Sequence, residues 1–252
     1  MDVRSDSLRA AHVGFGLEDG VAFRMRCMVS HNGGVQGLTI GRIPSMRTID
    51  FLHDNVASFI HSEARIEGAG CTFADTQEII SYGRTTGATD QDIQIVIGLK
   101  HAWEYLFEHY TEPVSFEHFA NYNFFVQQGY RPRGGEIRTE DITISNTDYV
   151  PVPHSVDEFY NVIGTACDGY NSYSDQALTM LFMLCKHQFF WDGNKRSSQL
   201  LVNHYLANQD SGIYLMIPEG NEEQFHEDLI QFYEGNMSLD DVTWLDNYIW
   251  AV

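Results

Sequence analysis

Residues 187–196 read HQFFWDGNKR, and this stretch decides how the rest of the chain is interpreted. Apolar residues recur with helical spacing before and after it, so we expect a loop that joins two helices. The N–H groups at the start of a helix attract anions, and Gly193 lets an anion approach the backbone closely. Asn194, Lys195 and Arg196 add hydrogen-bond donors and positive charge. The loop therefore predicts a binding site for a phosphate group.

Asp192 in the same loop is suited to a metal ion. Magnesium usually takes one or two carboxylates together with phosphate oxygens and water. A second interpretation is that Asp-Gly-Asn forms an ordinary turn and that the two basic residues begin a solvated helix. Composition alone leaves both interpretations open.

Helical spacing of apolar residues continues outward from this loop across most of the chain. Gly68 is placed to end the first helix, and Ser115 is placed to cap a later one. A last segment, Leu239–Trp250, closes the chain. The predicted helices run from 45 to 68, from 74 to 82, from 90 past 107, from 115 to about 128, from 155 to 167, from 174 to 186, from 196 through 205 and from 222 to 233.

Two regions interrupt this helical pattern. Residues 129–153 begin with glycines and a proline and continue with isoleucines that alternate with polar residues, which predicts a small β-hairpin or extended flap. Residues 1–44 are rich in glycine and charge, with short strands expected around Val21–Val29 and Val35–Ile43. The prediction is an all-α bundle over residues 45–252 with a hairpin flap and a separate N-terminal extension.

Composition excludes several classes of partner. The formal net charge is −20, from 35 acidic and 15 basic residues. This argues against nucleic acids and anionic membranes, which attract clustered Lys and Arg. No run reaches the roughly 20 apolar residues that span a bilayer, and Met1–Gly20 has no apolar signal region. We expect one cytoplasmic domain with a sizeable core.

Cysteines and histidines suggest no metal centre at this stage. The four cysteines, Cys27, Cys71, Cys167 and Cys185, include no CxxC pair, which argues against a zinc site or a disulfide framework. Several histidines have helical spacing without an obvious carboxylate partner, and we expect them to serve packing or the surface. These are His53, His61, His101 and His109.

The segment Phe190–Arg196 resembles the signature of the Fic/Doc family, His-Pro-Phe-x-(Asp/Glu)-Gly-Asn-Gly-Arg-x-x-Arg. Residues 133–152 look like the flap of that family, which docks a target segment by strand addition. Ser62–Gly68 is similar to the inhibitory motif (Ser/Thr)-x-x-x-Glu-Gly found before some Fic cores. The three features occur in the family's order, and the resemblance covers roughly residues 45–235.

The resemblance implies a Fic fold and transfer of AMP from Mg·ATP to a Ser, Thr or Tyr hydroxyl of a target protein. It assigns the metal to Asp192 and inhibition to Glu67. The phosphates would be held by Gly193, Asn194, Lys195, Arg196 and Gln199. The target would be positioned by the flap residues Arg138, Thr139, Ile142 and Ile144.

The catalytic base is the first departure from the family pattern. A gap-free alignment places Gln188 where the family has histidine, and glutamine cannot accept a proton near neutral pH. A one-residue insertion would place His187 there instead. We favour the gap-free alignment because it keeps Phe190 and Asp192 in register.

Three further departures weaken or change the implied activity. Lys195 replaces a glycine, as in Doc-type relatives that transfer phosphate instead of AMP. Gln199 replaces the second arginine and offers neither charge nor fork geometry. Glu63 stands where the inhibitory motif has Ser or Thr, and we expect Glu67 to pair with Lys195 or Arg196.

Three functions remain at this stage. The first is an AMP transferase. The second is a Doc-like kinase or another nucleotide-derived transfer, and the third is a degenerate Fic fold that binds nucleotide or protein without catalysis. Trp191 could stack on a base. Self-association is a further expectation, since surfaces of this kind often pair.

Overall fold

The computed structural model describes residues 17–18, 21–22, 46–127 and 133–252. By its contacts the chain divides into Met1–Ser45 and Met46–Val252. In the first unit, β1 (Leu17–Glu18) pairs antiparallel with β2 (Val21–Ala22). The strand expected from residue 21 therefore starts at β2. The remainder of that strand, and the one expected over residues 35–43, lie outside the described residues.

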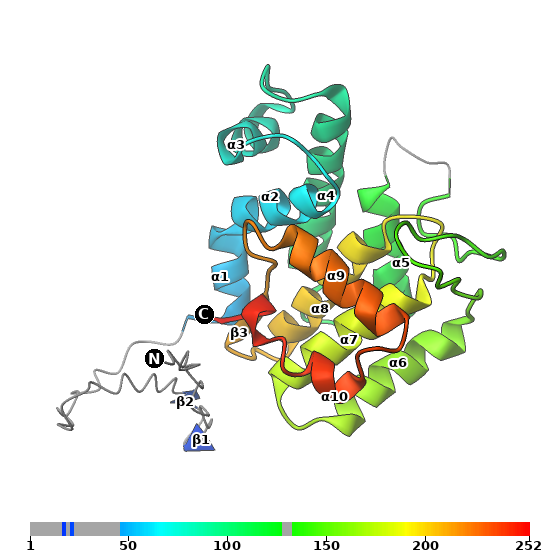
Figure 1. Ribbon diagram of the computed structural model, residues 1–252. Coiled ribbons are helices and arrows are strands. Elements are labelled where there is room, and N and C mark those ends of the chain that lie inside the picture. Colours follow the sequence, from blue (N-terminus) through cyan, green and yellow to red (C-terminus); the bar gives the residue numbers. More distant parts are fainter. Residues whose placement is uncertain (1–16, 19–20, 23–45, 128–132) are drawn as a thin grey trace, which may run out of the picture. The chain divides into compact units, whose positions relative to one another are not determined.

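The second unit is a bundle of helices with one small sheet (Figure 1). Its helices are α1 (Thr48–Asp54), α2 (Val56–Ile66), α3 (Phe73–Tyr82), α4 (Asp90–His109), α5 (Phe116–Val126), α6 (Val156–Gly169), α7 (Tyr173–His187), α8 (Asn194–Asn208), α9 (Glu222–Tyr233) and α10 (Leu239–Val242), with a 3₁₀ turn η1 (Asp246–Tyr248). Strand β3 (Ile213–Leu215) pairs antiparallel with β4 (Ile249–Ala251). The predicted all-α class is confirmed. Among the described residues, no helix combines the length and apolar character that a bilayer span requires.

Helix α8 lies at the centre of the bundle, in contact with α7, α5 and α4 (Figure 1). It is buried on nearly every side, although much of its sequence is polar. Two of its polar side chains are held by internal hydrogen bonds: Asn203 exchanges two hydrogen bonds of 2.9 Å with the backbone of Leu215, and His204 Nδ1 lies 2.7 Å from the hydroxyl of Tyr122. Buried polar groups that are fully paired fix a single packing arrangement. The second half of α8 is therefore anchored to β3 and α5.

The end of α2 is fixed by a glycine cap. Gly68 has φ +82° and donates to Arg65 O at 2.8 Å, while Ala69 donates to Ala64 O at 3.0 Å. This pair of bonds is a Schellman motif and confirms the cap predicted at Gly68. The helix predicted over 45–68 is nevertheless divided at Asn55. The Asn55 side chain donates to Phe51 O at 2.9 Å, a local bond that competes with the helical ladder.

Of the two forms predicted for this region, the hairpin is not formed by the described residues, and the extended flap remains. Residues 133–155 contain no strand, and their one bridge joins Ile137 to Phe190 in the loop before α8. The buried Arg138 side chain explains the difference, because it donates to backbone carbonyls on both sides of the segment. Its acceptors are the carbonyl oxygens of Gln188, Glu140, Val152 and His187. These bonds hold the segment extended without a second strand.

Glu63 in α2 is a buried acid whose titration should govern stability. It is 2% exposed, and its carboxylate accepts a hydrogen bond from Trp103 Nε1 at 3.2 Å. Burial raises the pKa of Glu63 from 4.5 to about 8, despite the Trp103 bond and the charge of Arg196, which both lower it. The folded state thus binds this proton more tightly than the unfolded state does.

We therefore expect the free energy of unfolding to fall as pH rises from about 5 to about 8, by at most about 1.4 kcal/mol per pH unit from this group. The glutamine in Glu63→Gln is neutral at every pH, so this variant should lose the pH dependence. Its free energy of unfolding, relative to that of the wild type, should therefore increase toward pH 8. Urea unfolding at pH 5.5, 6.5 and 7.5 measures this. Glu104→Gln, at an exposed position of α4, should retain the wild-type slope.

Candidate functional site

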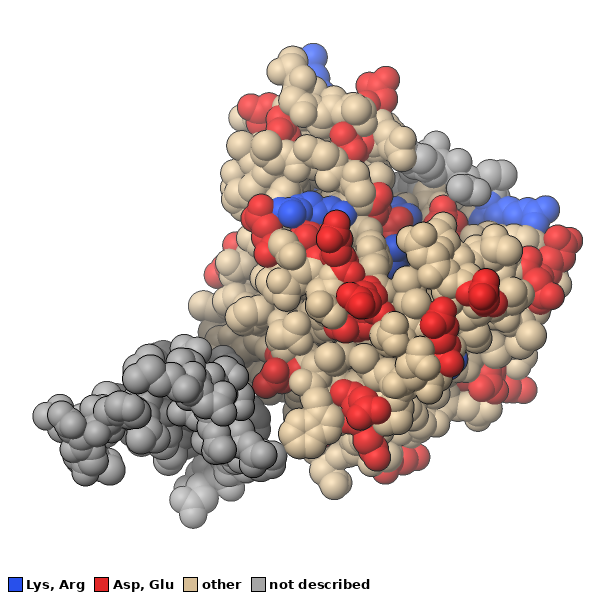
Figure 2. Space-filling model, in the orientation of Figure 1, with Lys and Arg blue, Asp and Glu red and all other residues tan. Residues whose placement is uncertain are grey.

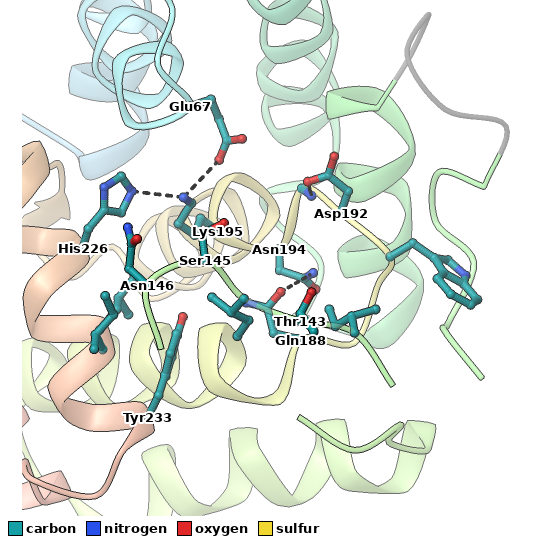
Figure 3. Close-up of a pocket in the computed structure, with 16 residues that line it drawn as sticks. Glu67, Thr143, Ser145, Asn146, Gln188, Asp192, Asn194, Lys195, His226 and Tyr233 are labelled. Carbon is teal, nitrogen blue, oxygen red and sulfur yellow. Dashed lines mark hydrogen bonds and ion pairs between the residues drawn. The ribbon is translucent and has the colours of Figure 1, made fainter. Parts of the chain in front are cut away.

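A cavity of about 350 Å³ opens at the start of α8 (Figure 3). This volume lies within the range of small-ligand sites. Four parts of the chain line it: Glu67 after α2, residues 142–146 of the extended segment, the loop before α8, and one face of α9. Figure 2 shows acidic side chains spread over this face of the molecule and a few basic atoms recessed in a depression. The loop singled out from the sequence therefore faces a cavity.

The loop owes its shape to Asn194. Its side-chain oxygen accepts from Phe190 N at 2.9 Å, and its amide nitrogen donates to Phe190 O at 2.8 Å and to Gln188 Oε1 at 2.9 Å. Asn194 is 3% exposed. The Asn194 side chain therefore holds the loop in shape and is not free to bind a ligand. The donors available to a ligand are the backbone N–H groups in the first turn of α8, which lack acceptors within the helix.

Gly193 begins α8 in a conformation that other residues avoid. Its φ is +75°, and a Cβ placed there would lie 2.4 Å from Gln127 Nε2. We expect Gly193→Ala to lower the free energy of unfolding by about 2–5 kcal/mol, from left-handed strain of about 1–2 kcal/mol and overpacking of about 1–3 kcal/mol.

Chemical denaturation of Gly193→Ala beside Gly83→Ala separates these two causes. Gly83 ends α3 with φ +72° and has nothing within 4 Å of its virtual Cβ, so its substitution adds strain alone. Equal losses in the two variants would contradict tight packing at Gly193.

Asp192 is the residue of the loop that could hold a metal ion at the cavity. Asp192 lines the cavity. Its backbone carbonyl accepts a hydrogen bond from Asn123 Nδ2 at 2.7 Å, and its Oδ1 accepts one from Gly193 N at 2.7 Å. One oriented carboxylate at a helix start fits magnesium, whose remaining ligands would be phosphate oxygens and water.

The two cations of the loop are already paired with a carboxylate. Glu67 lies 3.2 Å from Arg196 Nη2 and 3.8 Å from Lys195 Nζ. The pairing expected for Glu67 is therefore confirmed, with both partners at once, and Figure 3 shows the contact with Lys195. Lys195 Nζ also lies 3.0 Å from His226 Nε2 on α9. Burial, followed by the positive charge of Lys195, lowers the pKa of His226, which keeps this ring neutral.

The two candidates for the catalytic base lie in different surroundings. Gln188 lines the cavity, with its amide bonded to Asn194 and to Cys185 O at 2.7 Å. His187 is not among the lining residues; its Nδ1 bonds Met183 O at 2.6 Å and its Nε2 faces Glu158. The geometry supports the gap-free alignment, in which glutamine stands at the position of the base.

Several other predicted site residues lie outside the cavity lining. Gln199 is 1% exposed and donates to Lys195 O at 3.3 Å within α8. Arg138 is 1% exposed and serves backbone carbonyls, while Thr139 points outward as an exposed residue. Ile142 and Ile144 do line the cavity. Trp191 lines it too, with Arg133 stacked 4.7 Å from the centre of its ring.

Sequence reasoning missed the contribution of α9. His226, Ile230 and Tyr233 line the cavity at helical spacing i, i+4 and i+7. The available signal in the sequence was His226, a single histidine on the otherwise apolar face of α9. Nothing local in the sequence connects that face with a loop thirty residues earlier.

Comparison with known proteins agrees with this architecture. The Fic/DOC family model matches residues 113–206, which run from α5 through the extended segment to α8. A Fic domain-containing signalling protein from Bacteroides thetaiotaomicron superposes with a TM-score of 0.61 at 19% identity, over 80% of this chain and 85% of that one. Fic-1 from C. elegans superposes with a TM-score of 0.61 at 18% identity, over 80% of this chain and 67% of that one.

A Fic family protein from Desulfovibrio desulfuricans gives a TM-score of 0.62 at 13% identity, over 78% of this chain and 62% of that one. No curated protein matches the sequence. At these identities the solved structures establish the fold, and the family model establishes the segment that carries the loop. The chain therefore has the fold of these Fic-domain proteins, and its residues 113–206 match the Fic/DOC family model.

Proposed function

We propose that the cavity binds the phosphates of Mg·ATP and that the site transfers AMP to a Ser, Thr or Tyr hydroxyl of a target protein. The observation that carries this proposal is the ion pair of Glu67 with Lys195 and Arg196. A carboxylate already seated against these two cations supports an anion site there. The dipole of α8 and its first-turn N–H groups add to the same attraction.

Each part of the cavity has a task in this reaction. Lys195 and Arg196 would hold phosphate oxygens once Glu67 moves aside. Asp192 would hold magnesium, which when bound supplies charge neutralisation to the phosphates. Residues 141–144 have no helix, turn or strand partner among the described residues, so a target segment could add to them as a strand.

Gln188 is the observation that favours a second candidate, a Fic fold that binds nucleotide without efficient transfer. Its amide occupies the position of the base and is locked by two hydrogen bonds. General base catalysis contributes about 10²–10⁴ in rate, so a site without it should react slowly.

Radiolabelled ATP distinguishes the candidates. The chain is incubated with magnesium and ATP labelled at the α or the γ phosphate, with itself and a cell extract as acceptors, and ATP binding is measured by calorimetry. Protein labelled from the α position supports AMP transfer. Label from γ alone indicates phosphate transfer, the Doc-like reaction that Lys195 suggests. ATP binding without label supports the binding module, and no ATP binding contradicts both candidates.

A further inference from the structure

A second cluster of polar side chains lies beside the loop and outside the cavity lining. It joins three segments: His154 at the end of the extended stretch, Glu158 in the first turn of α6, and His187 at the end of α7. One ligand atom from each residue lies within 4.8 Å of the others. The separation of His187 Nε2 and Glu158 Oε1 is 3.4 Å, and the two imidazole rings are 4.4 Å apart between centroids.

The hydrogen bonds of His187 determine which nitrogen carries its proton. Its Nδ1 lies 2.6 Å from Met183 O. A carbonyl oxygen can only accept, so Nδ1 must be the donor. In the neutral ring, Nε2 then presents a lone pair to the Glu158 carboxylate, and two acceptors face each other. A cation between them, either a proton or a metal ion, removes this repulsion.

The surroundings resemble those of metal-binding histidines. A metal-bound imidazole almost always donates its other N–H to a carbonyl or carboxylate, as His187 does to Met183. Burial, followed by the nearby His187, lowers the pKa of His154, so this ring keeps a lone pair for a metal. The buried Phe189 ring stacks on His187 at 5.7 Å and lies 5.7 Å from His154, which gives the cluster an apolar backing.

One of the three separations between ligand atoms matches that around a tetrahedral ion. With bonds of about 2.1 Å, neighbouring ligand atoms around zinc lie about 3.4 Å apart. The distance between His187 Nε2 and Glu158 Oε1 matches this value. Glu158 Oε2 accepts from Asn161 Nδ2 at 3.1 Å, which orients the carboxylate. The Glu158 side chain is 39% exposed, so solvent can reach the open side.

We propose that His154, Glu158 and His187 form a Zn²⁺ site with two imidazole ligands, one carboxylate ligand and an exchangeable fourth position. The ion ties the end of the extended stretch to the end of α7, one residue before Gln188. It therefore fixes the two backbone segments that flank the nucleotide cavity. The site stands apart from the proposed reaction and does not depend on it.

A second histidine cluster provides the contrast. His109 Nδ1 lies 2.9 Å from one oxygen of Glu112, and His118 Nε2 lies 3.3 Å from the other. The remaining nitrogen of His118 bonds Ser115 Oγ at 3.2 Å. Here each carboxylate oxygen has its own histidine partner, so no ion is needed to separate unpaired acceptors.

Zinc titration of the full chain tests the proposal. After EDTA treatment and dialysis, ZnCl₂ is titrated by calorimetry into the wild type, Glu158→Gln, His154→Ala and, as control, Glu112→Gln. We expect the wild type and Glu112→Gln to bind one equivalent that the other two variants bind at least about tenfold more weakly. Glu158→Gln keeps an acceptor for Asn161, so a folding defect is not expected. Zinc at 100 times its Kd should raise Tm by about 5 °C or more.

Two direct readouts accompany the titration. CoCl₂ should give the strong visible absorption of a four-coordinate ion in the wild type and lose it in Glu158→Gln. Anomalous diffraction from zinc-soaked crystals should place the peak between the three side chains. Equal zinc affinity in the wild type and Glu158→Gln, a peak at the His109 cluster, or no binding would each overturn the proposal.

Discussion

Replacing Gln188 by histidine is expected to raise the rate of AMP transfer by about 100-fold. The residue lines the cavity and stands where the family motif has its histidine, and a positioned general base contributes about 10²–10⁴. The backbone accepts the change, because Gln188 has φ +49° and histidine is among the residues that tolerate this left-handed region. The measurement is incorporation of label from α-labelled ATP at saturating nucleotide.

Gln188→Asn is the matched control, because asparagine also tolerates a positive φ and has no group that titrates near neutral pH. It should show no gain. The gain in Gln188→His should increase between pH 5.5 and 7.5, as the imidazole loses its proton around its ordinary pKa of about 6.5. If ATP binds equally well to Gln188→His and the wild type but label does not increase, AMP transfer is not the reaction of this site.

The helices could be predicted from the sequence because their signals are local. Apolar spacing placed α3 to α9, and the residues Ser115 and Gly68 fixed two ends by capping chemistry. The break at Asn55 was missed because an asparagine in a helical pattern carries no sign of whether its side chain will bond the backbone. Here it bonds Phe51 O.

The hairpin, one of the two forms predicted for the extended segment, does not form because the partner of the segment is distant. Alternating isoleucines predicted a hairpin, which needs two strands from the same stretch. The structure instead pairs Ile137 with Phe190 and buries Arg138 among carbonyls at the end of α7. A buried arginine that serves the backbone of a segment fifty residues away leaves no pattern in its own neighbourhood. For the same reason His226 and the cluster of His154 with Glu158 could not be assigned from the sequence.

The loop and its pairing with Glu67 were predicted because the family motif links them. The motif placed Glu67 and the cations of α8 in one site although more than 120 residues separate them. Geometry then showed what the motif could not. The Asn194 side chain bonds the backbone of the loop, and the Gln199 side chain is buried among the packed helices. Residues that fit a signature can therefore hold the site together without touching a ligand.

Replacing Glu67 by glutamine is expected to raise the affinity for Mg·ATP by about 10- to 100-fold. A nucleotide phosphate and the Glu67 carboxylate compete for the same cations, and coupling between two such ligands is typically 1–3 kcal/mol. Glu67→Gly should act in the same direction. Calorimetric titration of ATP in the presence of magnesium measures the change. Glu219→Gln is the control, since Glu219 pairs with Arg65 outside the cavity and should leave ATP affinity unchanged.

The same substitution should lower the stability of the nucleotide-free protein, although it raises the affinity for ATP. The Arg196 side chain is only 6% exposed, and its Nε has no hydrogen-bond partner among the described residues. Removing the carboxylate leaves the buried Arg196 guanidinium without its ion-pair partner. Breaking a buried ion pair on one side costs up to about 3–5 kcal/mol. Glu67→Gln should therefore have a lower Tm than the wild type without ATP and show a larger rise when ATP is added. A lower Tm with no increase in ATP affinity would mean that Glu67 only supports the fold, and that Lys195 and Arg196 do not receive the phosphates.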